Sequence, residues 1–203
     1  MSIYDDFRGI PTGNICDQTE GMHASPEGIM PLDVGMSFCG RALTVRCDPG
    51  DNLPIHKALT VARPGDVLVV SCGDRNTGIF GEMLTLSCMS KGIKAFVTDG
   101  GVRDRKEIIE LGFPVFSASV SPNGSGKIDC GKINVPVKLC GVTVRPGDVV
   151  VGDGDGVCFI PLEQAEEVLR KAKAKKEKES ELRKRIMKGV TVAEAMGFAD
   201  KLK

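Results

Sequence analysis

Hydrophobic residues along this chain recur in two patterns, one typical of strands and one typical of helices. The order of these patterns along the chain predicts a fold. Short runs rich in β-branched and aromatic residues, bounded by glycine and proline, predict strands. We expect strands near 41–47, 66–70, 94–100 and 113–120, a hairpin-like pair over 133–144, and two strands around an acidic glycine turn over 149–162. Apolar residues spaced three and four apart predict helices at 54–62, 81–91 and 104–111. Central strand-helix-strand units with β-rich flanks predict a mixed α/β layered domain.

The two ends of the chain have helical patterns of a different kind. Short helical pieces are expected at Asp5–Arg8 and Pro11–Glu20, the second ending at Gly21. A long helix is expected from Pro161 to about Met187, although 173–181 contains one apolar residue and cannot bury a face. Its alternating charges favour a solvated helix, and packing against another subunit is the alternative. We therefore expect one domain over 1–161 and a helical extension over 162–203.

One octapeptide occurs almost twice, as RPGDVLVV at 63–70 and as RPGDVVVG at 145–152. Proline presets one backbone dihedral of a tight turn, and the following glycine frees the next. Two copies are too few for a repeat architecture, which needs about three units to bury a continuous core. The repeat predicts a recurring turn-plus-strand element without chemistry of its own.

Composition narrows the classes of function. Lys plus Arg and Asp plus Glu both total 27, so the net charge is zero and no basic field favours nucleic acid. No apolar run is long enough for a membrane span, and the start lacks a signal-peptide pattern, so a cytoplasmic protein is expected. The eight cysteines contain no CxxC pair, and the two histidines lie far apart. Reduced, mostly buried thiols are therefore expected, rather than a zinc site.

The stretch TDGGVRDRKEI at 98–108 places opposite charges side by side between a strand pattern and a helix pattern. Gly100 and Gly101 predict a tight strand-to-helix turn, and ligands of open α/β sheets bind at such strand ends. Arg103 would clamp an anion, and Asp104 would hold a hard divalent cation such as magnesium. The alternative is structural, with Asp104 capping the helix that follows. Glu107 would then complete a capping-box-like arrangement.

Two further glycine-bearing segments, 73–82 and 151–157, are expected to converge with this stretch at one sheet end. The first opens a helix at Gly81, whose free N–H groups and dipole favour a carboxylate or phosphate. Glu82 is a candidate second carboxylate, or simply a favourable acid at a helix start. Asp153 and Asp155 lie in a turn where aspartate is common, and we do not expect them to be ligands.

The order and spacing of six segments carry a resemblance to a known family. The segments are GDNLPIHKAL, RPGDVLVV, IFGEMLTLSCMSKGIKAFVTDGGVRD, LGFPVF, INVPV and RPGDVVVGDGDGV. Together they resemble the class II pyruvate aldolases, a family that includes 4-hydroxy-4-methyl-2-oxoglutarate aldolase and regulator of ribonuclease activity A. The resemblance spans Phe7 to Ile186. It implies a swivelling β/β/α-type domain with mixed sheets, assembled as a homotrimer or a homohexamer with sites between subunits.

The resemblance also implies roles for particular residues. Arg103 would bind the carboxylate of a 2-oxo acid, and Asp104 would carry the divalent metal, Mg²⁺ or Mn²⁺. The remaining substrate-binding positions would be Gly81, Glu82, Met83 and Leu84, with Glu82 also catalytic. The aldolase branch usually has aspartate at the Glu82 position. A neighbouring subunit's tail would add a carboxylate, for which Glu177, Glu179 and Glu181 are candidates.

The function implied is cleavage of a 4-hydroxy-2-oxo acid to pyruvate, with oxaloacetate decarboxylation as a side activity. Substrates would be of the 4-hydroxy-4-methyl-2-oxoglutarate or 4-carboxy-4-hydroxy-2-oxoadipate type. No lysine is needed for a Schiff base, because the metal stabilises the enolate. The alternative is a non-catalytic, protein-binding regulator of ribonuclease activity. Retention of Glu82, Arg103 and Asp104 together favours the enzyme.

Overall fold

A nine-stranded mixed sheet forms the centre of the molecule in the computed structural model, which describes residues 2–19 and 28–202. Its main path runs β1-β6-β5-β3-β2-β10-β11, with β4 added to β5 and β7 added to β2. The strands are β1 (Met30–Pro31), β2 (Phe38–Arg46), β3 (Asp66–Ser71), β4 (Gly78–Phe80), β5 (Ala95–Val102), β6 (Val115–Val120), β7 (Lys132–Ile133), β10 (Val149–Asp153) and β11 (Gly156–Ile160). A separate hairpin joins β8 (Val137–Leu139) to β9 (Val142–Val144).

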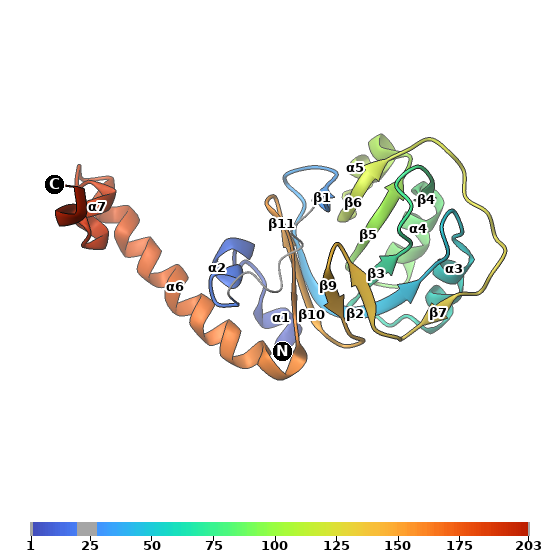
Figure 1. The fold of residues 1–203 in the computed structure, drawn as a ribbon, viewed down its shortest axis with the longest axis horizontal. Coiled ribbons are helices and arrows are strands. Elements are labelled where there is room, and N and C mark those ends of the chain that lie inside the picture. Colours follow the sequence, from blue (N-terminus) through green and yellow to red (C-terminus); the bar gives the residue numbers. More distant parts are fainter. Residues whose placement is uncertain (1, 20–27, 203) are drawn as a thin grey trace.

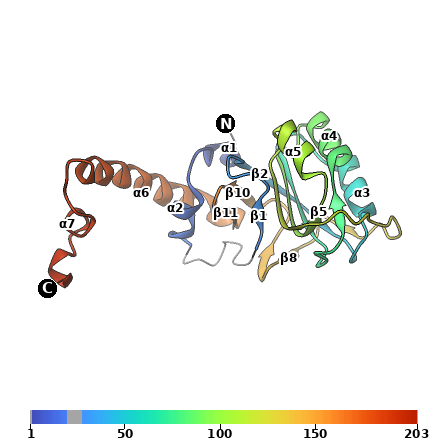
Figure 2. The same cartoon turned by 90° about the horizontal axis from the view of Figure 1, so that it is seen from above.

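Strands β2, β3, β5 and β6 pair in parallel, because a helix connects each to the next. The connecting helices are α3 (Leu53–Val61), α4 (Glu82–Ser90) and α5 (Arg105–Leu111), and they lie together on one side of the parallel strands (Figures 1 and 2). The antiparallel strands β10 and β11 extend the sheet from β2, and β11 approaches β1 at the opposite edge. The sheet is therefore nearly closed, like a barrel.

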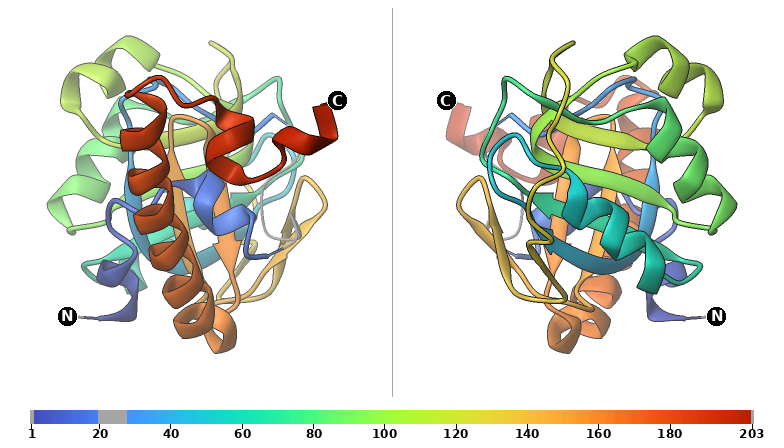
Figure 3. Two further views of the ribbon diagram at one scale, coloured as in Figure 1. Left: turned by 90° about the vertical axis from the view of Figure 1, so that its left-hand side faces the viewer. Right: turned by 90° about the vertical axis from the view of Figure 1, so that its right-hand side faces the viewer.

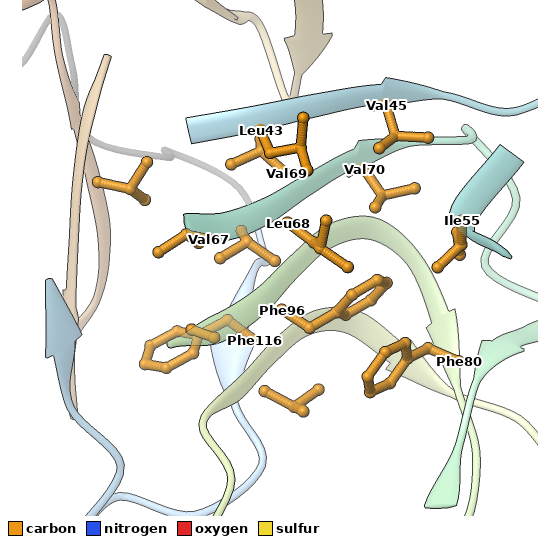
Figure 4. Packing of buried hydrophobic residues seen from close by; sticks show 14 of the residues in the cluster. Leu43, Val45, Ile55, Val67, Leu68, Val69, Val70, Phe80, Phe96 and Phe116 are labelled. Atoms are coloured by element: carbon orange, nitrogen blue, oxygen red, sulfur yellow. The ribbon is translucent and has the colours of Figure 1, made fainter. Parts of the chain in front are cut away.

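The core is built from the apolar runs of the parallel strands. Strand β3 is buried along Val67–Val70, as expected for a strand covered on both faces. Phe80 stacks on Phe96 with ring centroids 3.8 Å apart (Figure 4), and Phe116 contacts Phe38 edge to face. This packing fixes the carboxyl ends of β4 and β5, where the candidate site lies.

A second, smaller core lies on the other side of β10 and β11. It is covered by the short helices α1 (Ile3–Asp6) and α2 (Thr12–Cys16) and by the start of α6 (Ala165–Ile186). A 3₁₀ turn, η1 (Leu162–Gln164), leads into α6, which extends away from the sheet and carries α7 (Val192–Met196) and η2 (Ala199–Leu202) at its far end (Figures 1 and 3). Residues 176–181 of this helix are exposed in the single chain, which agrees both with a solvated helix and with a helix that packs against another subunit.

The repeated octapeptide forms the same turn twice. Gly65 and Gly147 have φ angles of 92° and 89°, and a strand follows each turn. In each copy the aspartate accepts a hydrogen bond from the arginine N–H three residues earlier, at 2.8 Å for Asp66 and 2.7 Å for Asp148. The structural interpretation of the repeat is confirmed.

The turn predicted at Gly100 and Gly101 is wrong, because β5 continues through both glycines to Val102. Neither residue has a positive φ. Their role is close approach instead, since a Cβ on Gly101 would lie 2.7 Å from the Thr77 carbonyl oxygen. The chain turns one step later, at Arg103 and Asp104, so these two residues lie at the very end of the strand.

The helix predicted at 81–91 is confirmed as α4, although Met83, Leu86 and Met89 are exposed by 67%, 42% and 43%. A second helix prediction falls partly outside the structure. Helix α2 ends at Cys16, and the stop signal predicted at 20–21 lies outside the described residues. No helix within 2–19 and 28–202 combines the length and apolar character needed to cross a membrane.

Candidate active site

Strands β4 and β5 bring two of the three glycine-bearing segments together. Gly78 pairs with Gly101 and Phe80 with Val102, and the Arg103 N–H donates to the Phe80 carbonyl oxygen at 2.9 Å. The third segment lies elsewhere, because the β10–β11 turn packs under α2, where Asp153 accepts hydrogen bonds from Thr12. Convergence of all three segments is therefore wrong, and Asp153 has a structural role.

Asp104 occupies the turn between β5 and α5 in a left-handed conformation, with φ 56° and ψ 41°. Aspartate tolerates this region better than most residues. Its side chain does not cap the helix that it precedes. Instead, Oδ2 accepts a hydrogen bond from the Glu82 N–H at 3.0 Å and lies 3.6 Å from Arg103 Nε. The capping interpretation of Asp104 is thus wrong, and with it the capping box at Glu107.

Two glycines, which have no side chain, leave space for the Arg103–Asp104 turn. A Cβ on Gly81 would overlap Asp104 Oδ2, and one on Gly78 would lie 2.9 Å from Arg103 Cβ and 2.7 Å from the Ser121 carbonyl oxygen. Any larger residue at either position would move the pair. The glycines therefore set the distance between the start of α4 and the two charged side chains.

A cavity of about 320 Å³ opens beside this turn. Three groups of residues line it: the β4–α4 junction, the Arg103–Asp104 turn, and a rim from α3 and the 124–127 loop. Side chains of Arg103 and Asp104 remain accessible, at 48% and 35% exposure. Helix α4 begins here at Gly81 with no side-chain cap, so first-turn amides including those of Met83 and Leu84 have no helical acceptor. The cavity thus combines a guanidinium, a carboxylate and a helix N-terminus.

Asn52 also lines this cavity, and sequence reasoning missed it. The residue is 94% buried, since its exposed fraction is 6%. Its Nδ2 donates to the Ile79 carbonyl oxygen at 3.0 Å, whereas Oδ1 is the one buried side-chain oxygen or nitrogen of the described residues without a hydrogen-bond partner. A buried acceptor without a donor is costly in an apo protein and suits a site that a ligand fills.

We expect Asn52→Asp to lower the free energy of unfolding by about 1–3 kcal/mol. The change removes the donor to the Ile79 carbonyl oxygen and leaves two acceptors facing each other in a buried place. Urea denaturation followed by circular dichroism measures the effect. Asn134→Asp is the matched control, since that residue follows β7 outside the cavity. Equal stability of Asn52→Asp and wild type would show that the Asn52 amide carries no such constraint.

The outer rim of the cavity carries His56 and Lys127. Asp51 holds the loop that bears Lys127, because Asp51 Oδ2 accepts the N–H groups of Ile128 at 2.8 Å and Asp129 at 2.7 Å. Partial burial, and then the positive charge of Lys127, lower the pKa of His56 below its ordinary value of 6.5. Both effects favour the neutral form of the His56 ring, which can offer a hydrogen bond to a ligand.

Lys127→Ala is expected to raise the pKa of His56 toward 6.5, because the neighbouring cation disfavours protonation. Folding then depends less on pH. A lowered pKa means that the unfolded chain binds the proton more readily, so stability is lost as pH falls below 6.5. An NMR titration of the His56 ring measures the shift, with Lys57→Ala as control on the same helix. A His56 pKa that does not rise in Lys127→Ala contradicts this electrostatic account.

Other sequence candidates lie outside the cavity within a single chain. The Glu82 side chain is half-buried but does not line the cavity, although its backbone N–H binds Asp104. Glu177, Glu179 and Glu181 lie on α6, which leaves the sheet on the side away from α4 (Figure 1). Among the residues that the structure describes, no three His, Cys, Asp or Glu side chains gather as a metal cluster.

Comparison with known proteins places this geometry in a family. The model of the RraA-like family, described as Aldolase/RraA, matches residues 12–159. This chain belongs to the RraA-like family. The match covers the whole sheet except β11's last residue, and it includes every residue of the Arg103–Asp104 cavity.

Relatives of this RraA-like chain carry names from both branches of the family. A protein of Halalkalibacterium halodurans, named provisionally as 4-hydroxy-4-methyl-2-oxoglutarate aldolase, is 41% identical over 188 residues, which are 92% of this chain and 89% of that protein. Among solved structures, an uncharacterized protein from Pseudomonas syringae has a TM-score of 0.86 and 28% identity, covering 96% of this chain and 92% of the other. The RNA-processing inhibitor RraA from Thermus thermophilus has a TM-score of 0.68 and 30% identity, covering 74% and 92%.

These likenesses confirm the fold predicted for the RraA-like chain, a single α/β domain with a mixed sheet and a charged C-terminal helix. They also confirm the family resemblance. The names divide between an aldolase and an inhibitor of RNA processing, so family membership alone leaves the activity open.

Proposed function

We propose that this chain is a divalent-metal-dependent aldolase that cleaves a 4-hydroxy-2-oxo acid to pyruvate and decarboxylates oxaloacetate as a side activity. Substrates of the 4-hydroxy-4-methyl-2-oxoglutarate or 4-carboxy-4-hydroxy-2-oxoadipate type carry the required 2-oxo acid end. One observation carries the proposal: Arg103 and Asp104, held 3.6 Å apart, line one cavity that a helix N-terminus also enters.

The chain's own groups suit the acid end of such a substrate. Arg103 is half-exposed, and its guanidinium can donate two parallel hydrogen bonds to a carboxylate or to a carboxylate and an adjacent oxo group. First-turn amides of α4 add dipolar attraction for the same negative charge. Together they would hold the substrate in one orientation.

The donors present fit a hard cation of the Mg²⁺ or Mn²⁺ type. Asp104 uses Oδ2 for the Glu82 N–H, and within the described chain Oδ1 accepts no hydrogen bond. A single carboxylate is enough for Mg²⁺, which keeps several waters, and the partnerless Asn52 Oδ1 is an acceptor for such a water or for the substrate hydroxyl. When bound, the cation supplies Lewis-acid stabilisation of the negative charge that develops on the 2-oxo group.

Bond cleavage requires removal of the 4-hydroxyl proton while the C3–C4 electron pair moves into the pyruvate enolate. Arg103 neutralises charge beside that enolate, which lowers the barrier where charge builds up. The proton acceptor is a water positioned either by Glu82 or by a glutamate of a neighbouring subunit. The enolate then takes a proton at C3 and leaves as pyruvate. Oxaloacetate reaches the same enolate after losing carbon dioxide.

The cytoplasm is the expected compartment. A homotrimer or homohexamer would supply the neighbouring glutamate. In its own chain α6 leaves the sheet on the side away from α4, so its carboxylates would serve a cavity only in another copy of the chain (Figure 1). Glu179 already accepts a hydrogen bond from Asn14 at 2.7 Å, and Glu181 pairs with Lys184 at 2.6 Å. The segment 162–203 would thus act as an arm between subunits.

The test is pyruvate release by the purified full-length chain, coupled to lactate dehydrogenase, with each candidate hydroxy-oxo acid and with oxaloacetate. Turnover should require added Mg²⁺ or Mn²⁺ and should stop with EDTA. Absence of turnover on every substrate in the presence of metal would overturn the proposal.

The second candidate is a protein-binding regulator of an RNA-degrading enzyme. It is favoured by the exposed apolar side chains of Met83, Leu86 and Met89 on α4 and by the family's RraA members. Inhibition of a ribonuclease by wild type, retained in Arg103→Ala and lost in a Leu86→Glu/Met89→Glu variant, would support it. Loss of catalysis in Arg103→Ala with no ribonuclease inhibition by either protein would leave the aldolase alone.

A further inference from the structure

Two cysteines that are far apart in the sequence are in contact where α2 packs on β11. Cys16 Sγ, at the end of α2, lies 3.0 Å from Cys158 Sγ in β11, although 142 positions separate the two residues. All eight cysteines fall within the described residues and all are free thiols. Among them this pair alone has its sulfur atoms in mutual contact.

We propose that Cys16 and Cys158 form a reversible disulfide, a redox modification that fastens the N-terminal helix α2 to strand β11. The proposal is independent of the aldolase proposal, because neither cysteine lines the Arg103–Asp104 cavity.

The two thiols differ in solvent exposure, and this difference indicates which of them reacts first with an oxidant. Cys16 is half-buried, whereas Cys158 is 1% exposed. The contact between the two sulfurs, in which either thiol can donate, lowers the pKa of Cys16 and raises that of Cys158, and burial raises the pKa of Cys158 further. Cys16 is therefore the thiol that meets a soluble oxidant first, and Cys158 is the buried thiol that resolves the product.

With hydrogen peroxide as the oxidant, the chemistry closes in two steps. The Cys16 sulfur attacks one peroxide oxygen, so an S–O bond forms, the O–O bond breaks, and water leaves after proton transfer. Cys158 sulfur then attacks the sulfenic acid sulfur, an S–S bond forms, the S–O bond breaks, and a second water leaves. Two thiols are oxidised to one disulfide while one peroxide is reduced to two waters.

The link would lock a junction that already joins three parts of the molecule. Thr12 at the start of α2 donates to Asp153 through Oγ1 at 2.7 Å and through N at 2.8 Å, next to β11. On its other side α2 contacts α6, where Asn14 binds Glu179 at 2.7 Å and Asp17 pairs with Lys175. Oxidation therefore secures α2 between the sheet and the middle of α6 (Figures 1 and 3).

A bond across so long a stretch of chain constrains the unfolded state strongly, so the effect on stability is measurable. We expect the oxidised wild type to melt at least about 5 °C above the reduced protein, given a disulfide's usual stabilisation and the size of this chain. Reduction with dithiothreitol should reverse the difference.

The experiment treats the full chain with a small excess of hydrogen peroxide, blocks remaining thiols under denaturing conditions, and maps linked peptides by mass spectrometry without reduction. The expected product joins Cys16 to Cys158 and lacks two hydrogen masses. Complete alkylation of both cysteines after oxidation, or linkage of either one to a different cysteine, would overturn the proposal.

Variants separate this pair from other thiol chemistry. Cys16→Ser removes the accessible partner at a half-buried position, and it should abolish both the linked peptide and the rise in melting temperature. Cys130→Ser is the matched control, because Cys130 is the exposed cysteine, and it should retain both effects. An oxidation-dependent rise that persists in Cys16→Ser, or disappears in Cys130→Ser, would contradict the assignment.

Discussion

Replacing Arg103 by alanine is expected to lower kcat/KM for aldol cleavage and for oxaloacetate decarboxylation by at least about 10³-fold. In the proposed mechanism the side chain both binds the substrate carboxylate and neutralises charge beside the enolate, so the loss should appear in kcat as well as in KM. Because Arg103 is half-exposed and the variant keeps the backbone N–H bond to the Phe80 carbonyl oxygen, the fold should be unaffected. The coupled pyruvate assay measures the rates.

Two further variants make this result specific. Arg103→Lys keeps the charge but loses the planar fork, so it should recover only a small part of the activity. Arg145→Ala changes an exposed arginine in the β9–β10 turn, outside the cavity, and should match wild type. Melting temperatures of all three should lie within about 2 °C of wild type. Activity of Arg103→Ala within tenfold of wild type would exclude the role assigned to Arg103.

Asp104→Asn should also lower the turnover rate by at least about 10³-fold, and it should remove metal binding. Asparagine is the sharpest substitution here because it tolerates the left-handed conformation at φ 56° and retains an oxygen that accepts the Glu82 N–H. What it removes is the negative charge that would hold the cation in the proposed mechanism. Isothermal titration with Mn²⁺ measures binding directly, separately from catalysis.

The matched control is Glu107→Gln, which removes a carboxylate from the first turn of α5 outside the cavity. It should bind Mn²⁺ and turn over like wild type. Metal binding by Asp104→Asn with unchanged affinity would show that another residue holds the cation. Removal of metal from wild type with EDTA should lower turnover as much as Asp104→Asn does. Added Mg²⁺ should restore turnover in the EDTA-treated wild type but not in Asp104→Asn.

Local patterns in the sequence predict much of this fold. The period of apolar residues predicts α3, α4 and α5, and the β-branched runs predict β2, β3, β5 and β6. The exposed face of α4 escapes such reasoning, because Met83, Leu86 and Met89 have helical spacing yet face away from the core. Spacing shows that a face is apolar, and it does not show which surface covers it.

The candidate site is predictable only in part for the same reason. Arg103 and Asp104 stand out because they are adjacent in sequence at a strand end. Asn52 does not, since it reaches the cavity through the register of β4 and a hydrogen bond to Ile79. The glycine segment of the β10–β11 turn was wrongly expected at the site, because aspartate-glycine turns have similar sequences wherever they lie. The pairing of Gly78 with Gly101, which brings the other two segments together, depends on the register of the sheet.

A crystal structure of the full-length chain soaked with pyruvate and Mn²⁺ tests the central claim most directly. Anomalous scattering should place the cation beside Asp104, with pyruvate between it and the Arg103 guanidinium. A cation or pyruvate bound only elsewhere, with this cavity holding neither at saturating concentrations, would contradict the account.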